Sequence, residues 1–360
     1  MNTRRTGVPV ITVVLMLACA ATARAQAIIK VNDDVNFKIG LLGQVQADWL
    51  TDPVSDSTAQ NLFVRRIRLM FGGQVAKNVT FFAETDSPNL GKTLAGGKNI
   101  TPSMIMQDAF GTFKVRNEFM LDVGLMFVPF SRQSIQSAAT LLPIDYSAYA
   151  FTQSAATQSS TGRDTGFQGR GYLDKGRFEY RLGLFSGARD APRSQRALRF
   201  AGRAQYQFFE TEGQGFFYTG TYLAKKKVLA VGAAFDTQKN YNAWSGDAFL
   251  DYPMGAGAFT GQLDYNFYNG GTFLTTLPKQ HVFFGEFGYL FKDYKLTPVL
   301  QLGAKDITGT DTGDDSRWSI GANYWWAAHN ANIKAAWGQI KPHGVERANQ
   351  FTVQFQFFYF

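Results

Sequence analysis

The chain has 360 residues, of which 45% are hydrophobic and 15% aromatic, and it carries a net charge of +8. Its mean hydropathy is −0.17, and no apolar run after residue 25 is long enough for a membrane helix, which excludes a helical membrane protein. The 36 glycines and 33 phenylalanines are typical of a curved sheet with girdles of aromatic residues rather than of a helical protein.

The first 25 residues have the pattern of a secretory signal peptide. Arg4 and Arg5 supply the charged start, an apolar stretch follows, and a small-residue cleavage site ends at Ala25. Cleavage there leaves 335 residues with a charge of +5 and removes the only cysteine, so the mature chain has no thiol or disulfide chemistry. We therefore expect a signal peptide at 1–25 and a single exported domain at 26–360.

Sixteen strand-like segments with period-2 alternation follow in chain order. They span roughly 35–50, 62–75, 79–86, 104–115, 119–128, 163–173, 177–187, 198–209, 227–237, 245–252, 258–268, 280–291, 296–306, 316–327, 332–340 and 348–360. An outward apolar band, an inward polar lining and an alternation of short turns with long loops predict an all-β fold, a 16-stranded antiparallel transmembrane β-barrel. The connection at 210–226 is long where a short turn is due, and the sequence offers no reason for it.

The last segment reads FTVQFQFFYF and alternates cleanly at first. Phe355 and Phe357 share the apolar face, and the glutamines between them lie on the polar face. Phe358 and Phe360 then fall on the polar face as well, unless a β-bulge near Phe357-Phe358 restores the phase.

Arginine carries the most specific chemical signal. Fourteen of the sixteen arginines after residue 25 lie between Arg65 and Arg203. A charge at mid-bilayer on the lipid face costs about 2–4 kcal/mol, which assigns the arginines of the strands to the lumen. Arg65 falls on the apolar face near the outer rim, where it would reach the lipid head groups. The predicted residues of an anion path along the pore are Arg66, Arg68, Arg132, Arg163, Arg170, Arg181, Arg199 and Arg203.

Three roles for these arginines remain open, and the first is to shape the electric field along the pore, because the charge that lines a pore sets its selectivity. Guanidinium groups on adjacent strands offer bidentate bonds to phosphate or carboxylate solutes. They also brace a wall by pairing with neighbouring acids. We expect the arginines on one arc of the wall, facing a more acidic arc that contains Asp247, Asp251, Asp264 and Glu286.

The connection at 129–162 has an apolar middle, and we expect it to pack inside the lumen. The three histidines, His281, His329 and His343, show no metal-ligand spacing. His329 falls in an expected tight turn and His343 in an expected loop, and both are expected to be exposed. No nucleophile–base pair accompanies them. We therefore expect no enzymatic activity, no cofactor and no metal site.

Several stretches, in the same order along the chain, resemble the phosphate-selective porin O and P family. They include NLFVRRIRLMFGGQVAKNVTFFAETD (61–86), LDVGLMFVPFSR (121–132) and GRDTGFQGRG (162–171). The resemblance implies a 16-stranded barrel of the bacterial outer membrane, commonly trimeric, with an inward-folded third loop and an arginine-lined channel.

Together, these observations predict a passive porin for small hydrophilic solutes with a modest preference for anions, phosphate among them. The expected partners are outer-membrane lipid and lipopolysaccharide, small anionic or neutral solutes, two further copies in a homotrimer, and the barrel-assembly machinery during biogenesis, but no nucleic acid. The alternative is a non-conducting barrel that acts as a surface adhesin or scaffold, with its lumen plugged by the third loop.

Overall fold

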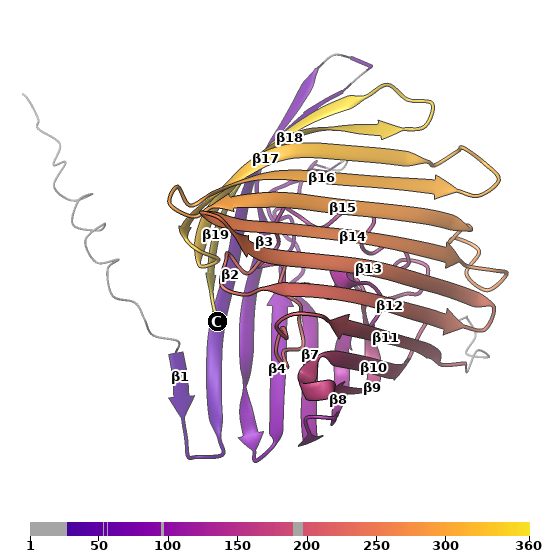
Figure 1. Cartoon of the computed structure of the whole chain (residues 1–360). Helices are drawn as coiled ribbons and strands as arrows, with labels where there is room; N and C mark the ends of the chain where they lie inside the picture. The colour runs from indigo at the N-terminus through magenta and orange to yellow at the C-terminus, as the bar shows by residue number, and fades with distance from the viewer. Residues whose placement is uncertain (1–26, 53, 56, 95–96, 190–196) are drawn as a thin grey trace, which may run out of the picture.

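The computed structural model describes residues 27–360, apart from 53, 56, 95–96 and 190–196, and contains one closed antiparallel barrel (Figure 1). Each barrel strand pairs with its neighbours in the chain, and the ring closes where β19 (Ala348–Tyr359) pairs with β2 (Asn36–Thr51). The expected signal peptide at 1–25 lies outside the described residues.

The sixteen barrel strands match the sixteen expected segments, with boundaries that differ by at most four residues. The fourteen strands between β2 and β19 are β3 (Thr58–Ala76), β4 (Val79–Asp86), β7 (Ile105–Arg116), β8 (Phe119–Phe127), β9 (Arg163–Leu173), β10 (Phe178–Phe185), β11 (Arg199–Gln207), β12 (Val228–Gln238), β13 (Tyr241–Met254), β14 (Gly257–Asn269), β15 (Gln280–Phe291), β16 (Leu296–Ile307), β17 (Asp315–Ala327) and β18 (Ala331–Pro342). Three short strands are unexpected: β1 (Ala27–Lys30), which extends the sheet beside β2, and the paired β5 (Thr93–Leu94) and β6 (Gly97–Lys98).

The antiparallel order places the connections at two opposite ends of the barrel. The tight turns at 77–78, 117–118 and 328–330 lie at one end, called the turn end here, together with the chain's last residue. The connection 128–162 begins and ends at the other, the loop end. It contains the one-turn helix α2 (Arg132–Ile135), which starts at a reciprocal capping box between Ser131 and Ser134. A short 3-10 helix, η1 (Asp174–Gly176), closes one tight turn.

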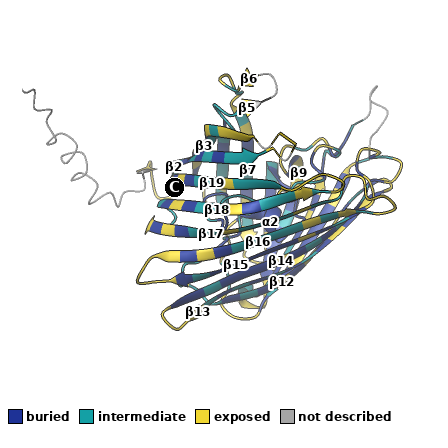
Figure 2. Cartoon of the chain, turned by 90° about the horizontal axis from the view of Figure 1, so that it is seen from above, coloured by how far each residue is buried: buried dark blue, intermediate teal, exposed yellow. Residues whose placement is uncertain are grey.

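Buried and exposed residues alternate along the strands (Figure 2). In β12, Ala234 and Asp236 are buried toward the interior, and Val231 and Phe235 are exposed on the outer face. This pattern gives an apolar outer wall and a polar inner wall. Among the described residues, no helix combines the length and the apolar character needed to cross a membrane.

The expected position of Arg65 is wrong. The pairing of β2 with β3 runs from Gln44↔Arg66 directly to Val45↔Val64, so Arg65 is the extra residue of a β-bulge. A bulge turns its extra side chain away from strict alternation. Arg65 therefore joins Arg66 on the inner side, where its Nε lies 2.6 Å from Asp145.

The β-bulge near Phe357-Phe358 that would have restored the phase does not form. The register between β19 and β2 is unbroken from Gln350↔Leu50 to Tyr359↔Leu41. Phe355 and Phe357 consequently remain on the outer face, where they are 41% and 38% exposed. Phe358 and Phe360 face inward instead, and they pack against a cluster that contains Leu42 and Met70.

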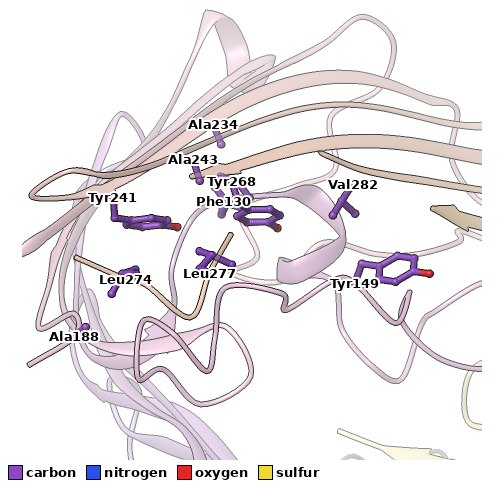
Figure 3. Packing of buried hydrophobic residues seen from close by; sticks show 10 residues of the cluster. All are labelled: Phe130, Tyr149, Ala188, Ala234, Tyr241, Ala243, Tyr268, Leu274, Leu277 and Val282. Carbon is purple, nitrogen blue, oxygen red and sulfur yellow. The ribbon is translucent and has the colours of Figure 1, made fainter. Parts of the chain in front are cut away.

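The core of the molecule lies inside the barrel. One cluster brings Phe130 of the connection 128–162 against Tyr268 of β14, with ring centroids 5.5 Å apart (Figure 3). Leu274 and Leu277 of the connection 270–279 belong to the same cluster, close to Tyr241 (Figure 3). Much of the barrel's interior is therefore packed protein rather than open space.

Candidate functional site

The connection 128–162 makes hydrogen bonds with strands on opposite sides of the barrel. Gln136 donates to Gln262 of β14 at 2.6 Å. Further along, Asp145 accepts from Arg66 of β3 at 2.5 Å. Between these two points, backbone carbonyls accept hydrogen bonds from the inward side chains of Gln44, Asn323, Lys334 and Gln356. The segment thus crosses the interior and divides it.

The connection between β11 and β12, residues 208–227, enters the interior from the turn end. The amide of Tyr218 donates to the Ile135 carbonyl at 3.2 Å, and the amide of Ser137 donates to the Tyr218 carbonyl at 3.0 Å. Glu212 accepts from both terminal nitrogens of Arg132 at 2.8 and 2.6 Å. The two segments meet in the interior, and this contact accounts for the length of a connection that the sequence leaves unexplained.

Four of the predicted arginines are covered by these segments and by neighbouring strands. They are Arg132, Arg181, Arg199 and Arg203, each at most 3% exposed. Each one is paired: Arg132 with Glu212, Arg181 with Glu179, Arg199 with Asp236, and Arg203 with Asp247, at 2.5–2.6 Å. We call this group the closed side.

The pair between Arg132 and Glu212 is strongly ionic. Burial lowers the pKa of Arg132, but Glu212, together with Tyr222 and Tyr218, outweighs burial and raises the pKa above its ordinary value. Burial likewise raises the pKa of Glu212, and Arg132 outweighs it, so the carboxyl titrates below its usual range. The Arg132 guanidinium also lies over the ring of Phe249, 3.7 Å from its centroid. These contacts hold Arg132 in place as a brace between the two segments.

On the other side of the connection 128–162 lies a cavity of about 500 Å³, called the loop-end cavity here. Six cationic side chains line it: Arg65, Arg66, Arg68, Lys92, Arg163 and Arg317. Three carboxylates line it: Asp48, Asp86 and Asp145. Cations therefore exceed carboxylates by three on its surface, and we call this part of the lumen the open side.

Asp145 holds two of these arginines at the cavity wall. Its two oxygens pair with Arg65 at 2.6 Å and with Arg66 at 2.5 Å. Burial raises the pKa of Asp145, but the two guanidinium groups outweigh burial and lower it well below its usual range. The carboxylate stays ionised at any pH near neutral, and it shares its single charge between two cations.

A second cavity, of about 300 Å³, lies toward the turn end and is called the turn-end cavity. Arg68 and Arg163 line both cavities, so these two side chains stand between them. Arg68 pairs with Glu84 at 2.8 Å and with Asp86 at 2.9 Å, and Arg163 pairs with Asp108 at 3.0 Å. The point where the cavities meet is consequently a network of ion pairs.

The predicted site residues thus divide into two groups. Arg66, Arg68 and Arg163 line the loop-end cavity, and Arg170 joins the last two at the turn-end cavity. The closed-side arginines line neither. Sequence reasoning missed Arg65, Lys92 and Arg317: a bulge hides the first, the second lies in a loop, and the third belongs to a strand far along the chain.

The four acids expected on a facing arc are buried on β13, β14 and β15. They do not stand apart from the arginines, because Asp247 pairs with Arg203 on the nearby β11. Asp122, on the arginine-bearing arc itself, pairs with Arg170 at 2.7 Å. Local pairs therefore neutralise arginines on the wall, and one of the four acids, Asp247, is among their partners.

The described residues contain no group of three histidine, cysteine, aspartate or glutamate side chains suited to a metal ion. His329 is not the exposed loop residue that was expected. Its ring is half-buried, and Nε2 lies 3.0 Å from the carbonyl oxygen of Thr221 in the segment 208–227. The turn that carries it therefore packs against the segment that enters from the turn end.

A sequence model of the family described as phosphate-selective porin O and P matches residues 39–298 of the chain. That range covers eleven of the sixteen expected strand segments in full and two in part, and it includes every predicted arginine. No curated protein matches the sequence significantly.

Solved porin structures share the fold at low sequence identity. The anion-selective porin from Comamonas acidovorans superposes with a TM-score of 0.61 at 12% identity, covering 90% of this chain and 100% of that one. OmpF of Salmonella typhi, in complex with daunomycin, gives 0.61 at 15% identity, covering 92% and 100%. The outer membrane channel DcaP of Acinetobacter baumannii gives 0.57 at 11% identity, covering 92% and 99%.

Proposed function

The chain belongs to the phosphate-selective porin O and P family, and from that premise we propose that solutes cross its barrel along the open side, through the loop-end and turn-end cavities. The protein is a porin of the bacterial outer membrane, with its turn end in the periplasm and its loop end outside. The two cavities share Arg68 and Arg163, which supports a continuous route past these side chains.

The route has a modest preference for anions. The observation that carries this proposal is the lining of the loop-end cavity, where six cationic side chains meet only three carboxylates. Charges that line a narrow pore bias which ions enter it. Because Arg65, Arg66, Arg68 and Arg163 are each paired with a carboxylate, the preference falls short of strict phosphate specificity.

The reversal potential of the purified protein in planar bilayers tests this proposal. With a gradient of potassium chloride, we expect a potential of the sign that marks chloride as the more permeant ion. A potential of the opposite sign would contradict the anion preference.

A second candidate function follows from the packed interior. The segments 128–162 and 208–227 fill much of the lumen, as expected of a barrel that serves as a surface adhesin or scaffold without conduction. Single-channel recording separates the two candidates: discrete current steps support the porin, and their absence from correctly folded protein supports the scaffold.

Several further features belong to the same proposal. Residues 1–25 act as a cleaved export signal, and the barrel-assembly machinery inserts the chain. The outer wall contacts lipid and lipopolysaccharide, and three copies assemble in the membrane. As a passive channel of this family, the chain acts on no substrate chemically.

A further inference from the structure

We propose that the turn-end cavity is a binding site for aromatic carboxylates, which makes these compounds preferred solutes of the channel. The binding part of this inference stands on the cavity alone. The transport part rests on the function proposed above.

Eight phenylalanines line this cavity, and six of them form one set of rings in contact: Phe82, Phe110, Phe127, Phe216, Phe217 and Phe360. Phe82 touches three of the others, with centroid distances of 5.9 Å to Phe110, 5.2 Å to Phe217 and 5.5 Å to Phe360. Phe216 lies 4.4 Å from Phe110. Edge-on and tilted contacts of this kind are the arrangements that aromatic rings prefer, and a further ring can join them.

An apolar lining is unusual at this place. The interior of a water-filled barrel is normally polar, since apolar area left in contact with water is unfavourable. A cavity of about 300 Å³ lined mainly by aromatic rings, with a few convergent charged groups, has instead the size and character of a small-molecule site.

Three features of the chain place phenylalanine rings around this cavity. Phe360 reaches the cavity because β19 keeps its register without a bulge. Glycines make room for its ring: a Cβ atom at Gly40 would lie 2.5 Å from its Cδ2, and one at Gly72 would lie 2.8 Å from its Cζ. Phe216 and Phe217 come from the segment 208–227. Chain regions far apart in sequence thus supply rings to one cavity.

The charged groups of the cavity favour an anion. Arg68, Arg163 and Arg170 line it with a single lining carboxylate, Glu84. Each arginine is paired, and the further partners Asp86, Asp108 and Asp122 lie behind the lining rather than in it. The guanidinium of Arg163 lies over the ring of Phe127, 3.5 Å from the centroid. Cationic and aromatic groups are therefore adjacent, within the span of one small aromatic acid.

This combination selects the ligand class. A hydrated phosphate gains nothing from six phenylalanine rings, and an aromatic cation would meet three arginines. A neutral aromatic molecule would use the rings but not the guanidinium groups. An aromatic carboxylate uses both, with its ring among the phenylalanines and its carboxylate toward Arg68, Arg163 and Arg170.

Isothermal titration calorimetry on the full, detergent-purified chain tests the binding. Benzoate, acetate and benzyl alcohol are the probes, because they separate the ring from the charge. We expect benzoate to bind at least about tenfold more tightly than acetate, since acetate lacks the ring that would be buried. Benzoate should also bind more tightly than benzyl alcohol. Equal binding of benzoate and either other probe overturns the inference.

Variants locate the site. Phe217→Ala should weaken benzoate binding severalfold, and the milder Phe217→Leu should weaken it less while preserving the packing of the segment. Phe355→Ala is the matched control, because it removes the same ring from the outer face, and it should leave benzoate binding unchanged. Equal losses in Phe217→Ala and Phe355→Ala would overturn the assignment to this cavity.

Bilayer recording separates this inference from the proposed function. If the channel conducts chloride and benzoate reduces the current where acetate does not, both stand. Benzoate binding without any conductance supports the site and contradicts the porin. Conductance with no distinction between benzoate and acetate contradicts the site and leaves the porin intact.

Discussion

The open side and the closed side of the barrel use the same residue type in opposite ways. Arg66 and Arg68 on the open side line a cavity, whereas Arg199 and Arg203 on the closed side face inward just as fully but line neither cavity. All four are paired with carboxylates. The difference teaches that an inward arginine contributes to a channel only when the segments inside the barrel leave space beside it.

The first prediction concerns the segment 208–227, which packs over arginines of the closed side. The amide of Glu210 donates to the carbonyl of Lys227 at 2.9 Å, so β11 and β12 remain paired up to the base of the segment. Replacing residues 211–226 by an Asn-Gly turn would close the hairpin directly. We expect single-channel conductance to rise severalfold, since the closed side loses its cover.

A matched control keeps this test specific. Shortening the exposed connection at 309–313, which lies at the loop end, should leave conductance near the parent value. If the 211–226 replacement folds and conducts like the parent, the segment does not restrict the pore.

The sequence predicts the wall far better than the interior. Alternation in the strands has a strict period, so sixteen segments and their inward faces can be predicted from local pattern alone. Bulges break that period without any local signal, which is why Arg65 is misplaced. The sequence likewise gives no sign that 208–227 enters the lumen, because its contacts with Ile135 and Ser137 are distant along the chain.

The site is harder to predict for the same reason. Seven of the eight predicted arginines lie on strands and satisfy the inward pattern, and only the segments packed beside them decide which of them meet solute. Which arginines are covered depends on where the connections 128–162 and 208–227 pack inside the barrel. The alternation of side chains along the strands does not encode this packing. Phe360 is a partial exception, since its parity along β19 does indicate an inward ring.

The second prediction tests the closed side as a brace. Arg203→Met leaves Asp247 buried without its partner, and removal of one member of such a pair costs about 3–5 kcal/mol. The temperature at which the folded barrel is lost on a gel should fall clearly. Arg116→Met is the control, because Arg116 and Glu118 are exposed and 4.0 Å apart, and exposed pairs contribute about 0–1 kcal/mol.

A double substitution sharpens this result. Arg203→Met combined with Asp247→Leu removes both charges and should recover most of the lost stability. A double variant as unstable as the single one would show that the loss comes from packing rather than from the unpaired charge.

The third prediction concerns selectivity and should separate the two sides. Arg66→Gln removes a charge from the loop-end cavity and leaves Asp145 paired with Arg65. Two charges about 4 Å apart interact by about 4 kcal/mol at an effective dielectric near 20, which is an upper bound for a solvated pore. The reversal potential should therefore move measurably toward zero.

The closed side supplies the control. Arg199→Gln with Asp236→Asn removes a buried pair of zero net charge, and the reversal potential should not move. Arg132→Ala should also leave selectivity unchanged. A larger shift from Arg132→Ala than from Arg66→Gln would reverse the assignment of the two sides.

The last prediction has the smallest expected effect. It concerns the contact between the segment 208–227 and the turn 328–330, where His329 meets the Thr221 carbonyl. Burial lowers the pKa of His329 to about 4, and its hydrogen bond to Thr221 opposes burial only in part, while Lys334 and Lys225 lower the pKa further. A histidine with a depressed pKa in the folded state contributes fully to stability above its unfolded pKa of 6.5. That contribution is lost progressively as the pH falls toward 4. At pH 6 the loss is about 1 kcal/mol.

Thermal stability should therefore decline between pH 7.5 and pH 5 in the parent. In His329→Gln, which keeps a donor for the Thr221 carbonyl but cannot titrate, the decline should be shallower, and equal slopes would rule out His329 as its source.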